Sequence, residues 1–198
     1  MLEKELAFPF PVKDGTKSVT SRSSQLTYGE VVVARIRHLI ARSLEYSSHT
    51  TISDVQWVES LIASAQHALD DSFQPCIVME DYKEQNAVAE CVNDVWRVSS
   101  VFDLMTAHFG DGEADLSRTT GVYLYEDPTL AREFVQAYVR KRPPRPGFAE
   151  RFPVYMLLDC LIIWDYVERH EPDWQGDEPM TFQEWASDYT SSYAELQW

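Results

Sequence analysis

Four polar side chains that could carry out group-transfer chemistry lie between residues 81 and 103. Asp81, Lys83 and Asn86 share one short polar segment, and Asp103 follows two apolar runs later. In phosphoryl transfer a protein mostly positions groups and neutralises charge, and an aspartate can accept the proton of an attacking hydroxyl. An asparagine and a second aspartate offer the oxygen ligands that Mg²⁺ prefers, and a lysine meets a phosphoryl group as a point charge. These residue types therefore indicate phosphoryl transfer.

The spacing of the apolar runs predicts how Asp103 returns to the polar segment. Residues 87–91 and 95–101 are strand-like, and Asn93-Asp94 between them is a hairpin turn signal. A short apolar run at 76–79 leads into the polar segment. We expect a loop and a tight antiparallel hairpin to bring the two carboxylates, the amide and the ammonium group together.

Two segments resemble a known family. The run D-Y-K-E-Q-N at 81–86 resembles the D-x-K-x-x-N catalytic loop of kinases. With V-F-D at 101–103 and F-G-D-G-E-A-D-L at 109–116, the longer stretch resembles the aminoglycoside phosphotransferase family, small-molecule kinases with a protein-kinase-like fold.

The resemblance implies a role for each matching position. Asp81 would be the catalytic base, with Lys83 beside it, and Asn86 and Asp103 would be the metal ligands. Asp115 would support the catalytic loop from behind. The resemblance also implies Mg²⁺ as cofactor, ATP or GTP as co-substrate, and a small-molecule hydroxyl as acceptor, including that of a cationic, aminoglycoside-like molecule.

The chain departs from the family pattern in two places. Met79-Glu80 stands where the family usually has His-Gly, and we find neither a glycine-rich loop nor a strand lysine paired with a helix glutamate. We therefore expect a C-terminal catalytic lobe whose N-terminal nucleotide lobe is absent. Two alternatives stay open: a catalytically degenerate, pseudokinase-like binding module, and a metal-dependent hydrolase, for which no histidine-rich ligand set is present.

Charge and hydropathy narrow the classes of partner. The formal net charge of −15 over 198 residues argues against nucleic acid or an anionic membrane, and it is compatible with a cationic substrate. No apolar stretch of signal-peptide length opens the chain, and the longest apolar run, 154–164, contains Asp159 and is too short to span a bilayer. We expect a soluble, cytoplasmic protein.

Hydrophobic periodicity predicts helices over most of the remaining chain. Thr27 and Glu30 form a capping-box pattern before the first helix, and Thr181 and Glu184 repeat that pattern before the last. The predicted helices cover residues 28–46, 53 or 54 to 69, 114–124, 128–140, 148–170 and about 182–196. We expect a mainly α fold with a small antiparallel hairpin, divided into an N-terminal tail or extended segment at 1–27 and a helical catalytic lobe at 28–198.

Acidic and aromatic residues gather in the C-terminal third. Asp159, Asp165 and Glu168 accompany Trp164 on one predicted helix. Carboxylates with aromatic walls suit a polyamine-like sugar, through charge-assisted hydrogen bonds and cation–π contact. The alternative is that the acids cover a solvated helix face while the tryptophan packs in the core. We expect these four residues to contribute to substrate binding.

Overall fold

The structure is a computed structural model, and it describes residues 26–171, 173–176 and 178–192. The predicted tail at 1–27 falls, except for its last two residues, outside the described residues. The chain is mainly helical with two small antiparallel sheets, of which the sequence predicts the helical character and one hairpin. The α-helices are α1 (Tyr28–Tyr46), α2 (Ile52–Leu69), α3 (Leu116–Glu126), α4 (Pro128–Lys141), α5 (Phe148–His170) and α6 (Phe182–Ser191).

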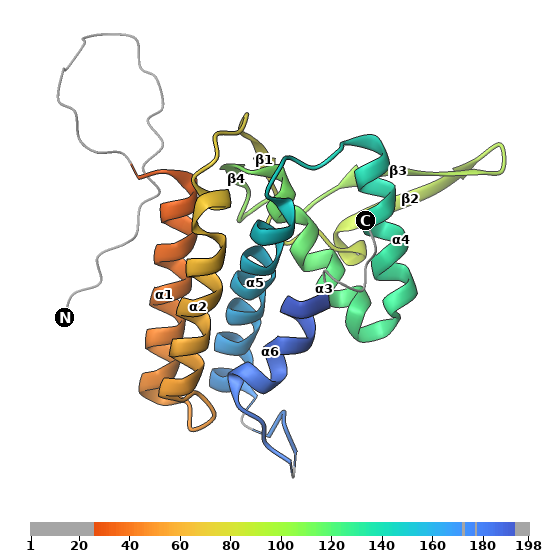
Figure 1. The fold of residues 1–198 in the computed structure, drawn as a ribbon. Coiled ribbons are helices and arrows are strands. Elements are labelled where there is room, and N and C mark those ends of the chain that lie inside the picture. The colour runs from red at the N-terminus through yellow and green to blue at the C-terminus, as the bar shows by residue number, and fades with distance from the viewer. Residues whose placement is uncertain (1–25, 172, 177, 193–198) are drawn as a thin grey trace, which may run out of the picture.

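Helix α5 is the central element, because both hydrophobic clusters include its residues. The larger cluster joins α5 to α1, α2 and α6, with Ile36, Val58 and Leu161 among its fully buried members. The smaller cluster joins α5 to α3 and α4 through Phe152 and Val135. Figure 1 shows α1 and α2 on one side of α5, and α3 and α4 on the other.

Capping residues fix where the helices begin. The capping box of Thr27 and Glu30 starts α1 as predicted. Helix α2 begins one or two residues before the predicted start at Ser53 or Asp54, because Thr51 is the N-cap and Asp54 is its capping-box partner. The predicted capping box of α6 is present, and the end predicted for this helix at residue 196 lies outside the described residues.

The strands form two separate pairs. In one pair β2 (Ala87–Val92) lies antiparallel to β3 (Val95–Val101), which confirms the predicted hairpin. Asn93 and Asp94 have φ of 52° and 61°, as both central residues of a type I′ turn require. In the other pair β1 (Cys76–Val78) lies antiparallel to β4 (His108–Gly110). Strand β4 was not predicted, because three residues are too few to show an alternating pattern.

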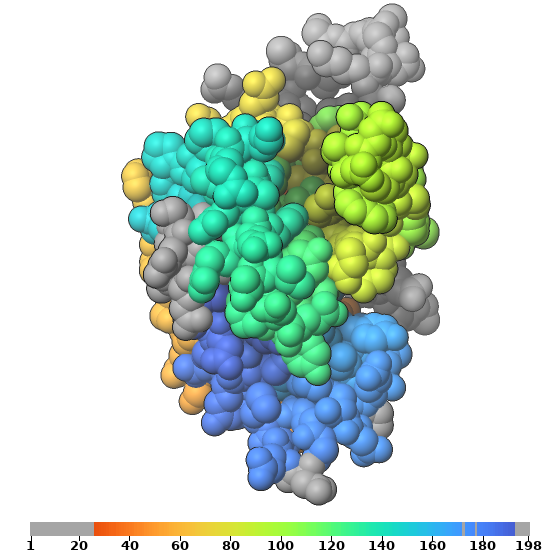
Figure 2. Space-filling view, turned by 90° about the vertical axis from the view of Figure 1, so that its right-hand side faces the viewer, coloured from red at the N-terminus to blue at the C-terminus, as the bar shows by residue number. Residues whose placement is uncertain are grey.

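A short 3₁₀ helix separates the strands from the helices that follow. This helix, η2 (Gly112–Asp115), is capped by the Asp111 side chain, so α3 begins at Leu116 instead of residue 114. A second 3₁₀ helix, η1 (Glu84–Asn86), lies in the polar loop after β1. Figures 1 and 2 show the β2–β3 hairpin extending from the helices beside α4. Within the described ranges, none of the helices combines the length and apolar character that crossing a bilayer needs.

Candidate active site

The polar loop between β1 and η1 is fixed at its start by Asp115. The Asp115 carboxylate accepts hydrogen bonds from the backbone N–H of Met79, at 2.9 and 2.8 Å, and from that of Glu80, at 2.8 Å. Burial raises the pKa of this carboxyl group, while the backbone donors act in the opposite direction. Asp115 thus supports the loop from the side of η2, at the position where the resemblance places a supporting carboxylate.

Asp81, Lys83 and Asn86 contact one another within this loop. The buried Asn86 side chain, 6% exposed, donates from Nδ2 to the Asp81 backbone oxygen at 2.9 Å and to Asp81 Oδ2 at 3.0 Å. Lys83 Nζ lies 2.8 Å from the same Oδ2. From α3, the Thr119 hydroxyl donates to the Tyr82 carbonyl oxygen. The loop therefore holds the Asp81 carboxylate in one orientation.

Asp103 follows directly after a backbone contact with Asn86. The Phe102 N–H donates to the Asn86 carbonyl oxygen at 3.0 Å, just beyond the end of β3. Asp103 is exposed and has φ of 60°, and Glu80 has φ of 68°. Non-glycine residues seldom adopt positive φ outside turns, and such backbone strain is concentrated at functional sites. Both strained residues flank the loop that holds Asp81.

Asn86 and Asp103 carry oxygen atoms of the kind that Mg²⁺ takes as ligands. Asn86 uses its amide nitrogen toward Asp81, so its Oδ1 takes no part in those hydrogen bonds, and the Asp103 carboxylate is exposed. Mg²⁺ commonly takes one or two protein oxygen ligands and completes its shell with water and substrate phosphates. Among the described residues no group of three or more His, Cys, Asp or Glu side chains is arranged to hold a metal. An ion at Asn86 and Asp103 would thus depend on oxygen atoms from its ligand.

Arg118 connects Asp81 to Asp159, and sequence analysis missed it. Its Nε lies 3.4 Å from Asp81 Oδ1 and 3.1 Å from Asp159 Oδ1. Asp159 is buried on α5, and burial raises its pKa to about 6, with Arg118 acting in the opposite direction. Arg118 follows Asp115 by three residues, a spacing that puts two side chains on one helical face. That spacing is the signal that could have identified it.

Glu80, the acidic residue directly before Asp81, has its own cationic partner. Its carboxylate forms a hydrogen-bonded ion pair with Arg35 of α1. The pair is partly buried, with side-chain exposures of 34% for Arg35 and 17% for Glu80. Arg35 therefore offsets the extra negative charge next to Asp81.

Three of the residues predicted to bind substrate make contacts within the chain. Trp164 is fully buried and meets the Trp174 ring edge-on at 5.3 Å. Asp165 accepts a hydrogen bond from Arg42 Nε at 2.9 Å, and Glu168 accepts one from Trp174 Nε1 at 2.7 Å. Their acidic and aromatic character serves the packing of α1, α5 and the segment before α6. Of the four residues predicted to bind substrate, Asp159 is the one that shares a partner, Arg118, with Asp81 of the loop.

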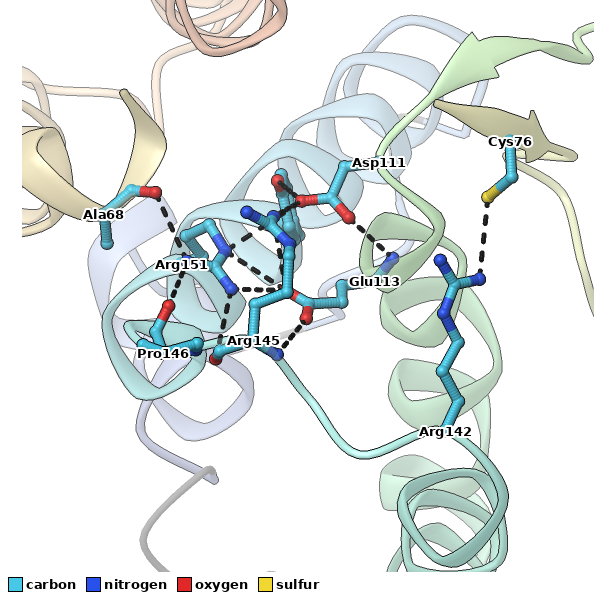
Figure 3. A network of polar contacts seen from close by, with 9 residues as sticks. Ala68, Cys76, Asp111, Glu113, Arg142, Arg145, Pro146 and Arg151 are labelled. Carbon is cyan, nitrogen blue, oxygen red and sulfur yellow. Dashed lines mark hydrogen bonds and ion pairs between the residues drawn. The ribbon is translucent and has the colours of Figure 1, made fainter. Parts of the chain in front are cut away.

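A buried ionic network lies beneath η2 (Figure 3). Arg151 is 1% exposed, and its Nε and Nη2 donate to Glu113 Oε2 at 3.1 and 2.7 Å. Arg151 Nη1 also donates to the Ala68 carbonyl oxygen at the end of α2, at 3.3 Å. Arg145 donates to Asp111 and, from its backbone, to Glu113 Oε1 at 2.8 Å. The network fixes η2, and hence Asp115, relative to α2 and α5.

Comparison with models of protein families gives no match, and comparisons with curated proteins and with solved structures give none either.

Proposed function

We propose that this chain is the catalytic lobe of a phosphotransferase, which transfers the terminal phosphoryl group of ATP or GTP to a hydroxyl of a small molecule. The observation that supports this most is the contact of Asp81 with both Asn86 and Lys83, on a loop whose backbone Asp115 holds. The order along the chain is two helices, a strand, this loop, the hairpin, strand β4 and further helices. This order is the one that the resemblance to a kinase-like C-terminal lobe implies.

Each side chain has a distinct task in this proposal. Asn86 and Lys83 contact Asp81 Oδ2 at 3.0 and 2.8 Å, whereas Oδ1 has the longer contact with Arg118, so Oδ1 is the atom that accepts the proton of the acceptor hydroxyl. Lys83 then meets the transferred group as a positive charge. Asn86 and Asp103 would hold Mg²⁺, which would neutralise charge on the nucleotide phosphates. Arg118, 3.4 Å from Oδ1, places a positive charge beside the base.

A second surface has to complete the nucleotide site. Phosphoryl transfer requires that the nucleotide be held and oriented, and the described residues supply only the surface with the loop and the hairpin. We propose that a further domain or a partner chain provides the other surface. Several apolar side chains of the hairpin are exposed, with Trp96 at 73%, which is in keeping with such a neighbour.

The second candidate is a pseudokinase-like module that binds without transferring phosphate. The replacement of His-Gly by Met79-Glu80 favours it, because the loop then lacks an orienting histidine and carries a carboxylate next to Asp81. The pairing of Glu80 with Arg35 weakens this argument, since the added charge is offset.

Nucleotide titration tests the two candidates. We expect MgATP or MgGTP to bind with a dissociation constant of roughly millimolar or below in calorimetry, and EDTA to weaken that binding. Asp103→Ala should abolish the Mg²⁺ dependence. Asp81→Ala should abolish transfer from labelled nucleotide to a panel of small alcohols while leaving nucleotide binding nearly intact.

The matched control is Asp94→Asn, which removes an exposed carboxylate at the hairpin turn and keeps a residue type suited to positive φ. It should leave both measurements unchanged. Binding without transfer in the unaltered chain would favour the module without catalysis. Full transfer by Asp81→Ala would refute the assignment of the base.

A further inference from the structure

We propose, on the basis of the function above, that the acceptor is a largely apolar, aromatic alcohol, whose body fills a cleft lined in part by Glu80 and Asp159. This differs from the polycationic sugar that the family resemblance suggests.

The cleft lies between α1, the segment after α2, β4 and α5. Its volume is about 1030 Å³, which is large enough for a drug-sized molecule. Apolar and aromatic side chains make up most of its walls, including Val31 of α1, Leu158 and Ile162 of α5, and Phe109 of β4. Leu158 and Ile162 are one helical turn apart and only partly buried, so both present surface to a ligand.

Aromatic rings build one wall of the cleft before any ligand arrives. Tyr28 lies edge-on to Phe73 with ring centroids 5.5 Å apart, and it stacks on His108 at 6.0 Å. Gly110 permits this arrangement, because a Cβ there would lie 2.5 Å from Tyr28 Cε2. A preformed aromatic wall favours a flat, apolar ligand over a heavily hydrated one.

Two acidic residues of the cleft lining lie close to the proposed base. Glu80 directly precedes Asp81, and both Glu80 and Asp159 line the cleft. Arg118 contacts Asp159 at 3.1 Å and Asp81 at 3.4 Å. One guanidinium group therefore connects a carboxylate of the cleft lining to the proposed base. A hydroxyl of a ligand bound beside Glu80 and Asp159 would therefore be placed near the loop that holds Asp81.

The carboxylates in and next to this part of the cleft already have cationic partners within the chain. The pairs are Glu80 with Arg35, Asp159 with Arg118, and Asp81 with Lys83. None of these three carboxylates needs a cation from the ligand for charge balance. Moving a polyamine from water to apolar walls also costs free energy. Asp70 and Asp71 also line the cleft but are exposed, so water solvates them. A neutral alcohol fits this environment better than an aminosugar.

Direct binding of model acceptors to the full chain tests this inference without any nucleotide. The probes are 2-(2-naphthyl)ethanol, a neutral aromatic alcohol that fluoresces, and kanamycin, a polycationic aminosugar. Ile162→Trp and Val31→Phe each fill part of the cleft from a different helix, and circular dichroism identifies which of them keeps the fold. Ile163→Trp is the matched control, since Ile163 is the next residue of α5 and does not line the cleft.

We expect naphthylethanol to bind more tightly than kanamycin, and the filled variants to weaken naphthylethanol binding by about tenfold or more. The Ile163→Trp control should bind like the unaltered chain. Tighter binding of kanamycin, or equal naphthylethanol binding in folded Ile162→Trp or Val31→Phe, would overturn the inference.

Nucleotide titration in parallel separates this inference from the proposed function. Nucleotide binding without naphthylethanol binding would refute the apolar acceptor and leave the phosphotransferase proposal in place. Naphthylethanol binding without nucleotide binding would refute the phosphotransferase proposal, and with it the role of the bound alcohol as an acceptor.

Discussion

At the level of single residues, the loop around Asp81 is positioned by side chains that bond to its backbone. The Asp115 carboxylate accepts hydrogen bonds from the N–H groups of Met79 and Glu80, and the Asn86 side chain donates one to the carbonyl oxygen of Asp81. Such bonds fix φ and ψ where no helix or sheet does so, including the positive φ of Glu80. The orientation of the proposed base therefore depends on residues that do not themselves react.

Removing the Asp115 carboxylate should loosen this loop. Asp115→Ala leaves two partly buried N–H groups without an acceptor, so we expect the free energy of unfolding in urea to fall by about 1–3 kcal/mol. Asp115→Asn keeps one oxygen acceptor and should lose less. Hydrogen exchange of the Met79 and Glu80 amides should accelerate in both variants. Unchanged exchange at these two amides in Asp115→Ala would contradict the supporting role.

The buried carboxyl group of Asp159 should make stability depend on pH. Its pKa is about 6 in the folded chain against an ordinary value of 3.8, so between these values the folded state binds more protons than the unfolded state. Stability from this group is therefore fully present below pH 3.8 and is lost as pH rises through about 6. Asp159→Asn removes the titration while Arg118 keeps Asp81 as a partner.

We expect the unfolding free energy of the unaltered chain, relative to Asp159→Asn, to increase as pH falls through this window, by about 3 kcal/mol at most. Urea unfolding of both proteins at a series of pH values measures the difference. A difference that is constant with pH, or that decreases on acidification, would show that Asp159 titrates elsewhere.

At the level of elements, the β2–β3 hairpin is the part least supported by packing. Nearly all its residues are exposed, and a two-stranded sheet alone is only marginally stable in water. The Asn93-Asp94 turn therefore contributes much of the hairpin's stability. Asp94→Gly creates Asn-Gly, the preferred type I′ sequence, and should slow amide exchange in β2 and β3, whereas Asn93→Val should accelerate it.

Amides in the middle of α5 serve as the internal control for this experiment. They lie in the shared core, so neither turn variant should change their exchange measurably. If α5 and the hairpin changed together, the hairpin would open only when the whole domain unfolds.

The elements differ in how far sequence could predict them, and local signals explain the difference. Capping boxes and long apolar stripes are local, so α1 and α5 were predicted with their bounds. Strand β4 depends on pairing with β1, about thirty residues away, and nothing in its three residues indicates that contact. In the site, the D-x-K-x-x-N spacing identified the loop, whereas Arg118 and Arg35 come from separate helices that only the fold brings to it.

At the level of the whole molecule, helix α5 links the core to the site. Its middle carries Asp159 beside the loop, its first turns carry Arg151 in the network under η2, and its last turns pack against α1 and α6. Movement of α5 would thus displace Asp159 and η2 together. The geometry around Asp81 depends in this way on the packing of the entire helical domain.

The pair of Arg151 and Glu113 offers the strictest test of this dependence. Arg151→Met leaves Glu113 and Asp111 buried with one cation fewer, so we expect a loss of about 3–5 kcal/mol in the free energy of unfolding. Adding Glu113→Gln removes the uncompensated charge, and the double variant should recover part of the loss. A double-mutant cycle in urea measures this coupling. The affinity for nucleotide should follow the same order as the unfolding free energy across the folded variants, because η2 carries Asp115. Additive losses of unfolding free energy, together with unaltered nucleotide binding, would show that the network stabilises α5 alone.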